Sequence, residues 1–295
     1  MDIVYTLPHR IHRLLTGIQP DVLNQNSESV YREHLLVEMK NLINKIDVEA
    51  FNPDTFQIDY TKLKNSDMYQ AYRELSTSLQ NFDLQSLNST GEKLAFWINL
   101  YNLLAVDAVI HYGVESSINE VNGVFYKAGY NIGGCFFGLH DIEQGILRAN
   151  TGHPAVPGAQ FASHDPRSKH IVPYLDPRIH FALVCAAESC PPINVYDAEK
   201  IDSQLDLATR NFINSSEVTI DLEKKQANLS KIFQWYAPDF GAKFSVTLGF
   251  GDATPILKWI ADFRSNLEEQ KILKNEADAF SIRFFDYNWS LNKAG

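Results

Sequence analysis

Cysteine is scarce in this sequence, which has three cysteines among 295 residues. Three thiols are too few for a disulfide framework and too scattered for a four-ligand zinc site. Residues 1–20 also lack the apolar core of a secretory leader, because acidic, basic and histidine side chains interrupt them. We therefore expect a cytoplasmic protein that holds no metal and no cofactor.

Basic residues are in the minority. The 26 lysines and arginines are outnumbered by 36 aspartates and glutamates, so the net charge is −10 at pH 7. An acidic chain without a basic run is a poor partner for a nucleic-acid backbone. The longest apolar stretch, residues 94–110, is interrupted by two asparagines and an aspartate, which makes it a poor membrane span. We expect neither partner, and the oligomeric state stays open.

The clearest local signal is a helix over residues 89–113. Ser89 followed three residues later by a glutamate is a capping-box pattern, and Gly113 suits the position just beyond a helix end. The residues between them are apolar on nearly every side of a helix. This pattern predicts a central, buried helix.

A polar seam runs along that apolar helix. At 100° per residue, Glu92 and Asn99 fall within about 20° of each other, and Asn102 lies about 80° further round. Buried polar groups need partners, since each costs about 1–3 kcal/mol when left unpaired. Either Glu92 caps the helix and the asparagines bind the backbone of a nearby loop, or the seam belongs to a functional site.

Other patterns predict a helix-rich α+β domain with a small antiparallel sheet over residues 61–295, and a helical N-terminal extension over residues 1–60 packed on it. Further helices are expected over residues 27–45, 67–80, 140–150, 197–214, 230–240 and 254–268. Strands are expected within residues 123–141, over 179–185, 217–221 and 227–229, and in the tail from residue 281.

Two of the cysteines stand together at the exit of the apolar run 179–185, which is typical of a short buried strand. Reactive groups often lie where a buried strand opens into a tight loop. In a regular strand His180 and Cys185 would point to opposite faces. Contact between them would therefore need a bulge. The alternatives pair His180 with Cys190, or Cys185 with His140.

The segment 151–174 is rich in Pro, Gly, Ser and His and has no periodicity. A loop of this length inside a compact domain is usually functional, and it is a candidate lid over the cysteines. Its three histidines, at positions 153, 164 and 170, match no metal motif. We interpret them as solvated loop residues.

Four blocks of the chain carry a resemblance: EKLAFWINLYN (92–102), DIEQGILR (141–148), DPRIHFALVCAAESCPPINVY (176–196) and FDYNWSLN (285–292). In this order they resemble the bacterial domain-of-unknown-function family 547, over about residues 65–292. The resemblance implies a fold like those of papain- or transglutaminase-type cysteine enzymes. It further implies a site that uses a Cys, a Glu, a His and a Tyr.

Carried onto this chain, the resemblance implies catalytic roles for Cys185, His180 and Tyr196, with Glu143 or Glu92 as the acid. The chain departs from the family at two positions. Gln144 stands where many members have His, and an alanine follows Cys185 where a glycine is frequent.

These features together predict a cysteine hydrolase or acyl transferase with a Cys-His-Glu arrangement, acting on an unknown peptide or amide substrate. One alternative is a thiol-redox protein that uses the two neighbouring cysteines, whose C-x₄-C spacing is wider than the C-x-x-C of thioredoxins. Another is a non-catalytic binding or adaptor domain. The residues expected to contact substrate are Asn99, Asn102, Cys190 and His140.

Overall fold

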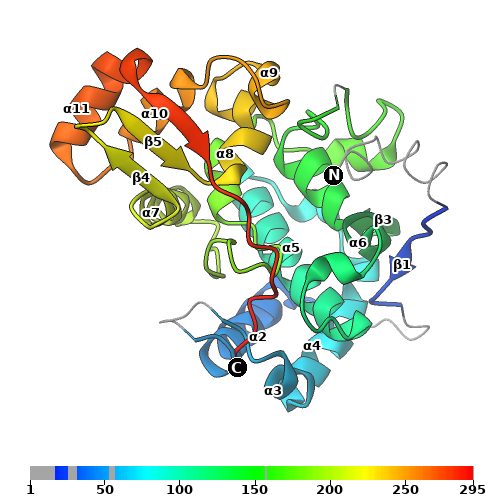
Figure 1. The fold of residues 1–295 in the computed structure, drawn as a ribbon. Helices are drawn as coiled ribbons and strands as arrows, with labels where there is room; N and C mark the ends of the chain where they lie inside the picture. Colours follow the sequence, from blue (N-terminus) through cyan, green and yellow to red (C-terminus); the bar gives the residue numbers. More distant parts are fainter. Residues whose placement is uncertain (1–16, 26–31, 53–56, 157, 295) are drawn as a thin grey trace.

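The structure is a computed structural model, and it describes residues 17–25, 32–52, 57–156 and 158–294 (Figure 1). Helix α2 (Leu35–Ala50) occupies part of the predicted N-terminal helix, whose expected start at Ser27 lies outside the described residues. The proposed division of the chain at residue 60 stays a prediction.

Helix α5 (Thr90–Tyr112) lies at the centre of the molecule. The Ser89 side chain accepts the Glu92 backbone N–H, the Glu92 carboxylate accepts the Ser89 N–H in return, and Gly113 ends the helix in the left-handed conformation. The predicted limits are therefore confirmed. By length and composition alone α5 could cross a membrane, but 89% of its most apolar stretch is buried in the protein, as in a core helix.

The helix-rich α+β class is confirmed, and the sheet component consists of two small mixed sheets. Their strands are short, and each sheet combines one parallel with one antiparallel pair. In the first, β2 (Ala128–Ile132) pairs parallel with β1 (Asp21–Val22) and antiparallel with β3 (Cys135–Gly138). In the second, β5 (Gln226–Leu229) pairs antiparallel with β4 (Val218–Asp221) and parallel with β6 (Ser281–Phe284).

The other helices are mostly short. They are α3 (Tyr60–Lys64), α4 (Asp67–Thr77), α6 (Val124–Lys127), α7 (Ile201–Ile213), α8 (Lys231–Trp235), α9 (Phe244–Thr247), α10 (Thr254–Ala261) and α11 (Leu267–Glu276). The single helix expected over residues 254–268 is two helices, because the Asn266 side chain accepts backbone N–H groups and starts a new one.

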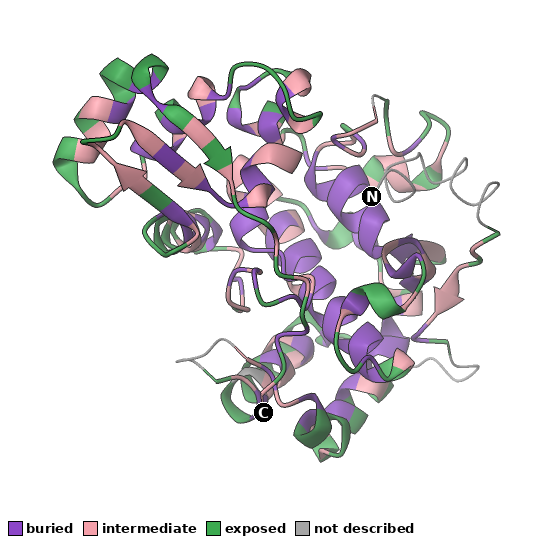
Figure 2. Ribbon diagram, in the orientation of Figure 1, coloured by how far each residue is buried: buried purple, intermediate pink, exposed green. Residues whose placement is uncertain are grey.

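Two hydrophobic cores form the interior. The first surrounds α5 and includes side chains of α2, α4 and the first sheet, whereas the second lies among the second sheet, α7, α8, α10 and α11. Buried segments of both cores appear in Figure 2. Residues 179–183 join them, since Ile179 and Leu183 belong to the first core and Phe181 to the second.

The strand expected over residues 179–185 does not form. A 3₁₀ helix (Pro177–Phe181) opens this segment, and Asp176 caps it by accepting the Arg178 N–H. Beyond it, the amide of Asn102 donates to the Ala182 carbonyl and accepts the Val184 N–H, both at 2.9 Å. One side chain of α5 thus satisfies the buried backbone groups that a neighbouring strand would otherwise have to satisfy.

Candidate functional site

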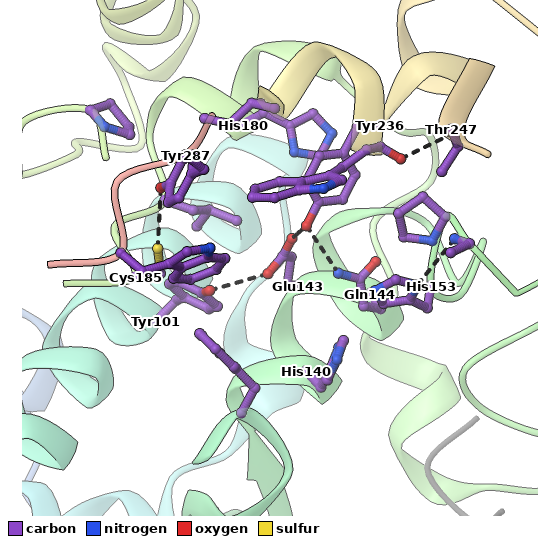
Figure 3. A pocket seen from close by; sticks show the side chains of 18 of the residues that line it. Tyr101, His140, Glu143, Gln144, His153, His180, Cys185, Tyr236, Thr247 and Tyr287 are labelled. Carbon is purple, nitrogen blue, oxygen red and sulfur yellow. Dashed lines mark hydrogen bonds between the residues drawn. The ribbon is translucent and has the colours of Figure 1, made fainter. Parts of the chain in front are cut away.

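A cavity of about 220 Å³ lies where the two cores meet, with lining residues from both. Figure 3 shows side chains from α5, from the π-helix (Asp141–Leu147), from the loop after it and from the tail converging on this space. Its polar and reactive lining residues are Tyr101, Asn119, His140, Glu143, Gln144, His153, His180, Cys185, Tyr236, Thr247 and Tyr287.

Cys185 and Tyr287 form one wall of the cavity, and Cys190 lies directly behind them; these three residues are here called the thiol wall. The two Sγ atoms lie 2.8 Å apart, and the Tyr287 hydroxyl lies 3.4 Å from Cys185 Sγ and 3.1 Å from Cys190 Sγ. The backbone N–H of Cys185 also donates to Cys190 Sγ at 3.1 Å. Both cysteines are free and partly buried, and Cys185 is the one that lines the cavity.

A tight turn brings the two sulfurs together. The Cys190 N–H donates to the Ala187 carbonyl at 3.0 Å, and Ala186 adopts a left-handed conformation with φ of 65°. An L-residue other than glycine resists this conformation by about 1–2 kcal/mol. Ala186 therefore sits at a strained position next to the two thiols, and such strain often accumulates at functional sites.

The two thiols differ in acidity. Burial raises the pKa of Cys190, but hydrogen bonds from the Cys185 thiol, the Tyr287 hydroxyl and the Ala187 and Cys185 backbone N–H groups outweigh it, so the net pKa is lowered. For Cys185, donation of its proton to Cys190 and then burial raise the pKa. The pair therefore favours a thiolate on Cys190 that accepts the proton of Cys185.

Glu143 faces the cavity from the π-helix (Figure 3). Its carboxylate accepts the Tyr101 hydroxyl at 3.1 Å and forms a second short hydrogen bond with the Tyr236 hydroxyl. π-Helices are rare in proteins, and those that occur often lie at functional sites. This acid is nine-tenths buried, and its two hydrogen-bond donors are neutral.

A buried ionic triad, formed by His180, Asp239 and Arg148, lies beside Glu143. His180 Nε2 donates to Asp239 Oδ2 at 2.7 Å, and Arg148 binds both oxygens of the same carboxylate at 2.7 and 2.6 Å. The imidazole also stacks on Tyr236 with ring centroids 3.9 Å apart. Burial alone would raise the pKa of Asp239, but the hydrogen bonds from His180 and Arg148 prevail and lower it to about 2.

Two further histidine rings, those of His140 and His153, lie 5.4 Å apart at the cavity. His153 Nδ1 accepts the Ala155 N–H at 3.0 Å, and burial together with nearby Arg148 lowers the pKa of this imidazole to about 4. It is therefore neutral at pH 7. The interpretation of His153 as a solvated loop residue is wrong, because its loop folds against the π-helix and encloses the ring.

Arg167 holds that loop in place. Its guanidinium binds Asp141 on the π-helix and Asp165 within the loop, both at 2.8 Å, and lies over the Phe161 ring at 4.4 Å from the centroid. The segment expected to be a lid thus contributes lining residues at 153–155 and is anchored by buried contacts.

Four of the predicted site residues lie away from the cavity. Glu92 is the helix cap described above and lies half-buried at the start of α5. Asn99 donates to the Tyr196 carbonyl and accepts the Tyr196 N–H, both at 2.8 Å, so that the two residues join α5 to the loop before α7. Asn102 holds the segment before Cys185. The polar seam of α5 therefore positions backbone, and it does not face a ligand.

The other predicted residues meet at the cavity. Cys185, His180, Glu143 and His140 line it, and Cys190 contacts Cys185 from behind. In the part of the chain that the structure describes, no hydrogen bond joins His180 to either sulfur, because its Nε2 binds Asp239.

Sequence reasoning missed several residues of the site. The most important are Asp239, Arg148, Tyr236, Tyr101 and Tyr287. Tyr287 lies in the resemblance block 285–292 and Arg148 in the block 141–148. Their places in these blocks were the sequence feature that could have marked them as site residues. Asp239 lies shortly after a tryptophan-tyrosine pair in a short helical pattern. No neighbouring residue in the sequence indicates that His180 and Arg148 bind it.

The described residues contain no group of three or more His, Cys, Asp or Glu side chains arranged to hold a metal ion. The cavity is lined by one thiol, a carboxylate, imidazoles and phenols, and the second thiol contacts the first from behind. Such groups can carry out nucleophilic, acid–base and thiol-redox chemistry.

Residues 84–213 match the family model described as "Protein of unknown function, DUF547". The predicted resemblance is thus confirmed for this segment, which holds three of the four blocks, the π-helix and both cysteines of the thiol wall. Searches of curated proteins and of solved structures found no match to this chain.

Proposed function

Taking the match of residues 84–213 to the DUF547 family as the premise, we propose that this protein is a thiol–disulfide exchange enzyme that uses Cys185 and Cys190. One observation carries the proposal: Cys185 lines a cavity of ligand size, and its sulfur is in contact at 2.8 Å with the sulfur of Cys190 behind it. A structural thiol has no need of a second sulfur, a hydroxyl and an open cavity around it.

The reaction begins with proton transfer between the sulfurs. Cys185 passes its proton to the Cys190 thiolate, and the resulting Cys185 thiolate attacks one sulfur of a substrate disulfide in the cavity. The substrate S–S bond breaks and one half leaves as a thiolate, which takes the proton from Cys190. Cys190 then attacks the Cys185 sulfur and releases the second half as a thiolate.

Two electrons thus pass from the cysteine pair to the substrate, and the protein is left with a Cys185–Cys190 disulfide. A small-molecule thiol, which the cytoplasm expected from the sequence would supply, reduces this disulfide by the reverse exchange. Tyr287 supports both steps, because its hydroxyl donates to whichever sulfur carries the negative charge.

A redox titration tests the proposal. The reduced protein is equilibrated with mixtures of reduced and oxidised dithiothreitol, alkylated and examined by mass spectrometry. We expect a loss of two hydrogens that maps to Cys185 and Cys190, with Cys135 still alkylated. A Cys135→Ser control should titrate like the parent protein, and Cys190→Ser should stop at a mixed disulfide on Cys185 when hydroxyethyl disulfide is added.

The rate of that last reaction is the second readout. We expect the reduced parent protein to react with hydroxyethyl disulfide at least about ten times faster than free glutathione at pH 7, because hydrogen bonds lower the pKa of Cys190, whose sulfur lies 2.8 Å from that of Cys185 and accepts its proton. The proposal fails if both cysteines remain alkylated in excess oxidant, or if the protein reacts no faster than glutathione.

A cysteine hydrolase or acyl transferase is the second candidate, favoured by the His180–Asp239 hydrogen bond of 2.7 Å in the same cavity. An imidazole oriented by a carboxylate is the usual base for a cysteine nucleophile. For this candidate His180→Ala should slow iodoacetamide labelling of Cys185, whereas in the exchange mechanism the variant should leave that rate within about twofold.

A further inference from the structure

The cavity is unusually rich in aromatic rings. Trp235 and Tyr287 lie with ring centroids 4.9 Å apart, and Tyr287 and Trp289 at 4.7 Å, so that three rings pack as one surface beside the sulfurs. The Phe, Tyr and Trp residues of the cavity lining are Tyr101, Phe125, Trp235, Tyr236, Tyr287 and Trp289.

The cavity lining holds one carboxylate, that of Glu143, and three imidazoles, those of His140, His153 and His180. Glu143 is the only carboxylate among the described lining residues, and no lysine or arginine is among them. Its two tyrosine partners occupy about half of the lone-pair directions of a carboxylate, which can accept about four hydrogen bonds. No cationic side chain is bonded to Glu143 in the described structure.

The positive groups near the cavity do not serve as a bonded counter-ion for Glu143. The Arg148 guanidinium lies 5.1 Å from the centre of the Tyr236 ring, is 2% exposed and binds both oxygens of Asp239. His180 donates to the same carboxylate. His153 is neutral at pH 7 because burial lowers its pKa to about 4. The cavity therefore presents aromatic faces, which carry negative potential, around a carboxylate bonded only to neutral side chains.

We infer that this cavity binds a small organic cation, with an alkylammonium group held between Glu143 and the surrounding aromatic rings. Aromatic cages recognise ammonium groups through the ring quadrupole, and a partly desolvated carboxylate adds direct attraction. This inference rests on the proposed function for the identity of the substrate: it is a disulfide or thiol compound that carries an ammonium group near its sulfur.

A neutral apolar ligand is the competing occupant. It would fit the rings but would cover the carboxylate of Glu143 without supplying a counter-charge or a hydrogen bond, which carries a desolvation cost. An anionic ligand would meet repulsion from the same carboxylate. Comparison of a cation with its neutral isostere therefore separates the two occupants.

The binding experiment uses the full chain with Cys185→Ser and Cys190→Ser, so that thiol chemistry cannot contribute. Choline and its neutral isostere 3,3-dimethyl-1-butanol are titrated, with calorimetry and the fluorescence of the cavity tryptophans as readouts. We expect choline to bind at least tenfold more tightly. Glu143→Gln in the same background should reduce this preference to threefold or less, and the exposed acid control Glu199→Gln should leave it unchanged.

A second variant guards against a folding defect at Glu143. Trp289 is only partly buried, so Trp289→Leu should leave the fold intact. We expect it to weaken choline binding at least fivefold and to change binding of the alcohol by less than twofold, because only the cation uses the ring quadrupole. Equal binding of the two probes, tighter binding of the alcohol, or no binding of choline at millimolar concentration would overturn the inference.

The thiol-intact protein completes the test. The rate at which it reacts is measured with cystamine, which carries ammonium groups, and with neutral hydroxyethyl disulfide. Each rate is divided by the rate at which glutathione reacts with the same compound. We expect a ratio at least tenfold higher for cystamine, lost in Glu143→Gln. Reaction with both at equal ratios would contradict the cation site alone, whereas no reaction with either, while choline preference persists, would contradict the exchange function alone.

Discussion

The thiol wall and the ionic triad reach the same cavity, the triad through His180, but they are held together differently. The two cysteines are five residues apart, and a tight turn with a left-handed Ala186 brings them into contact. In the triad, by contrast, Asp239 receives hydrogen bonds from residues 59 and 91 positions away. Local geometry thus positions the two thiols, and long-range pairing positions the buried charges beside them.

The triad also joins the two cores. Arg148 directly follows the π-helix, whose apolar side chains belong to the first core, and Asp239 lies in the 3₁₀ helix (Ala237–Phe240), whose apolar side chains belong to the second. Both charged side chains are nearly inaccessible to solvent. We expect changes in the triad to alter stability first, and changes in the thiol wall to alter reactivity first.

The largest effect should come from Asp239→Asn. The substitution leaves the buried Arg148 charge without its counter-ion, which typically costs about 3–5 kcal/mol of the free energy of unfolding. Asp206→Asn, which removes an exposed i,i+4 pair with Arg210, should cost about 0.5 kcal/mol or less. Urea unfolding of the two variants measures both. Equal losses in the two variants would show that the triad contributes no more to stability than an exposed ion pair does.

The acid dependence of stability should reveal the same carboxylate. Its pKa of about 2 lies below the usual value near 3.9, so Asp239 contributes about 2 kcal/mol that is fully present above about pH 4. This contribution is lost as pH falls through about 2, because protonation then weakens the bonds to His180 and Arg148. Urea unfolding between pH 5 and pH 2 should show a shallower decline for Asp239→Asn than for the parent protein.

On the thiol wall, Tyr287→Phe should change reactivity more than stability. Removal of the hydroxyl takes one hydrogen-bond donor from both sulfurs and so raises the pKa of Cys190. Because such a hydrogen bond contributes about 1 kcal/mol, alkylation by iodoacetamide at pH 7 should slow roughly fivefold. The exposed Tyr174 provides the control, because Tyr174→Phe should alter neither quantity. An unchanged alkylation rate in Tyr287→Phe would mean that the phenol does not act on the thiols.

The smallest effect concerns the turn. Ala186 and Ala187 are both 1% exposed, but only Ala186 has a positive φ. Replacement by glycine removes the same buried methyl group from each, and at position 186 it also relieves backbone strain. Ala186→Gly should therefore be about 1 kcal/mol less destabilising than Ala187→Gly in thermal unfolding. The opposite order would show that the turn is not strained.

Prediction from the sequence succeeded where the determinants are local. The limits of α5 follow from a serine, a glutamate and a glycine within a single helix, and the hairpin of β4 and β5 follows from alternation around a charged turn. The strand expected over residues 179–185 failed for the opposite reason. Its composition suits a buried strand, but Asn102, 80 positions away, satisfies the backbone in another conformation.

The site was predicted in part for the same reason. The contact between the two cysteines could be anticipated as an alternative, since a tight turn permits cysteines five residues apart to approach each other. The role of Glu92 could not be separated from that of Glu143 by sequence, because both acids stand in the first turn of a helix. Only the packing of the π-helix against α5 places Glu143 under two tyrosines and leaves Glu92 outside the cavity.

By itself, the sequence determined the central buried helix, the proximity of Cys185 and Cys190, and an acidic chain that resembles family 547. These features depend on side chains within a few residues of one another, whose geometry the covalent chain constrains. Tertiary structure alone decided that His180 binds Asp239 and not a sulfur, that Glu143 faces a cavity of aromatic rings, and that Tyr287 reaches both thiols. Such contacts join distant positions, and only the packing of the two cores brings them together.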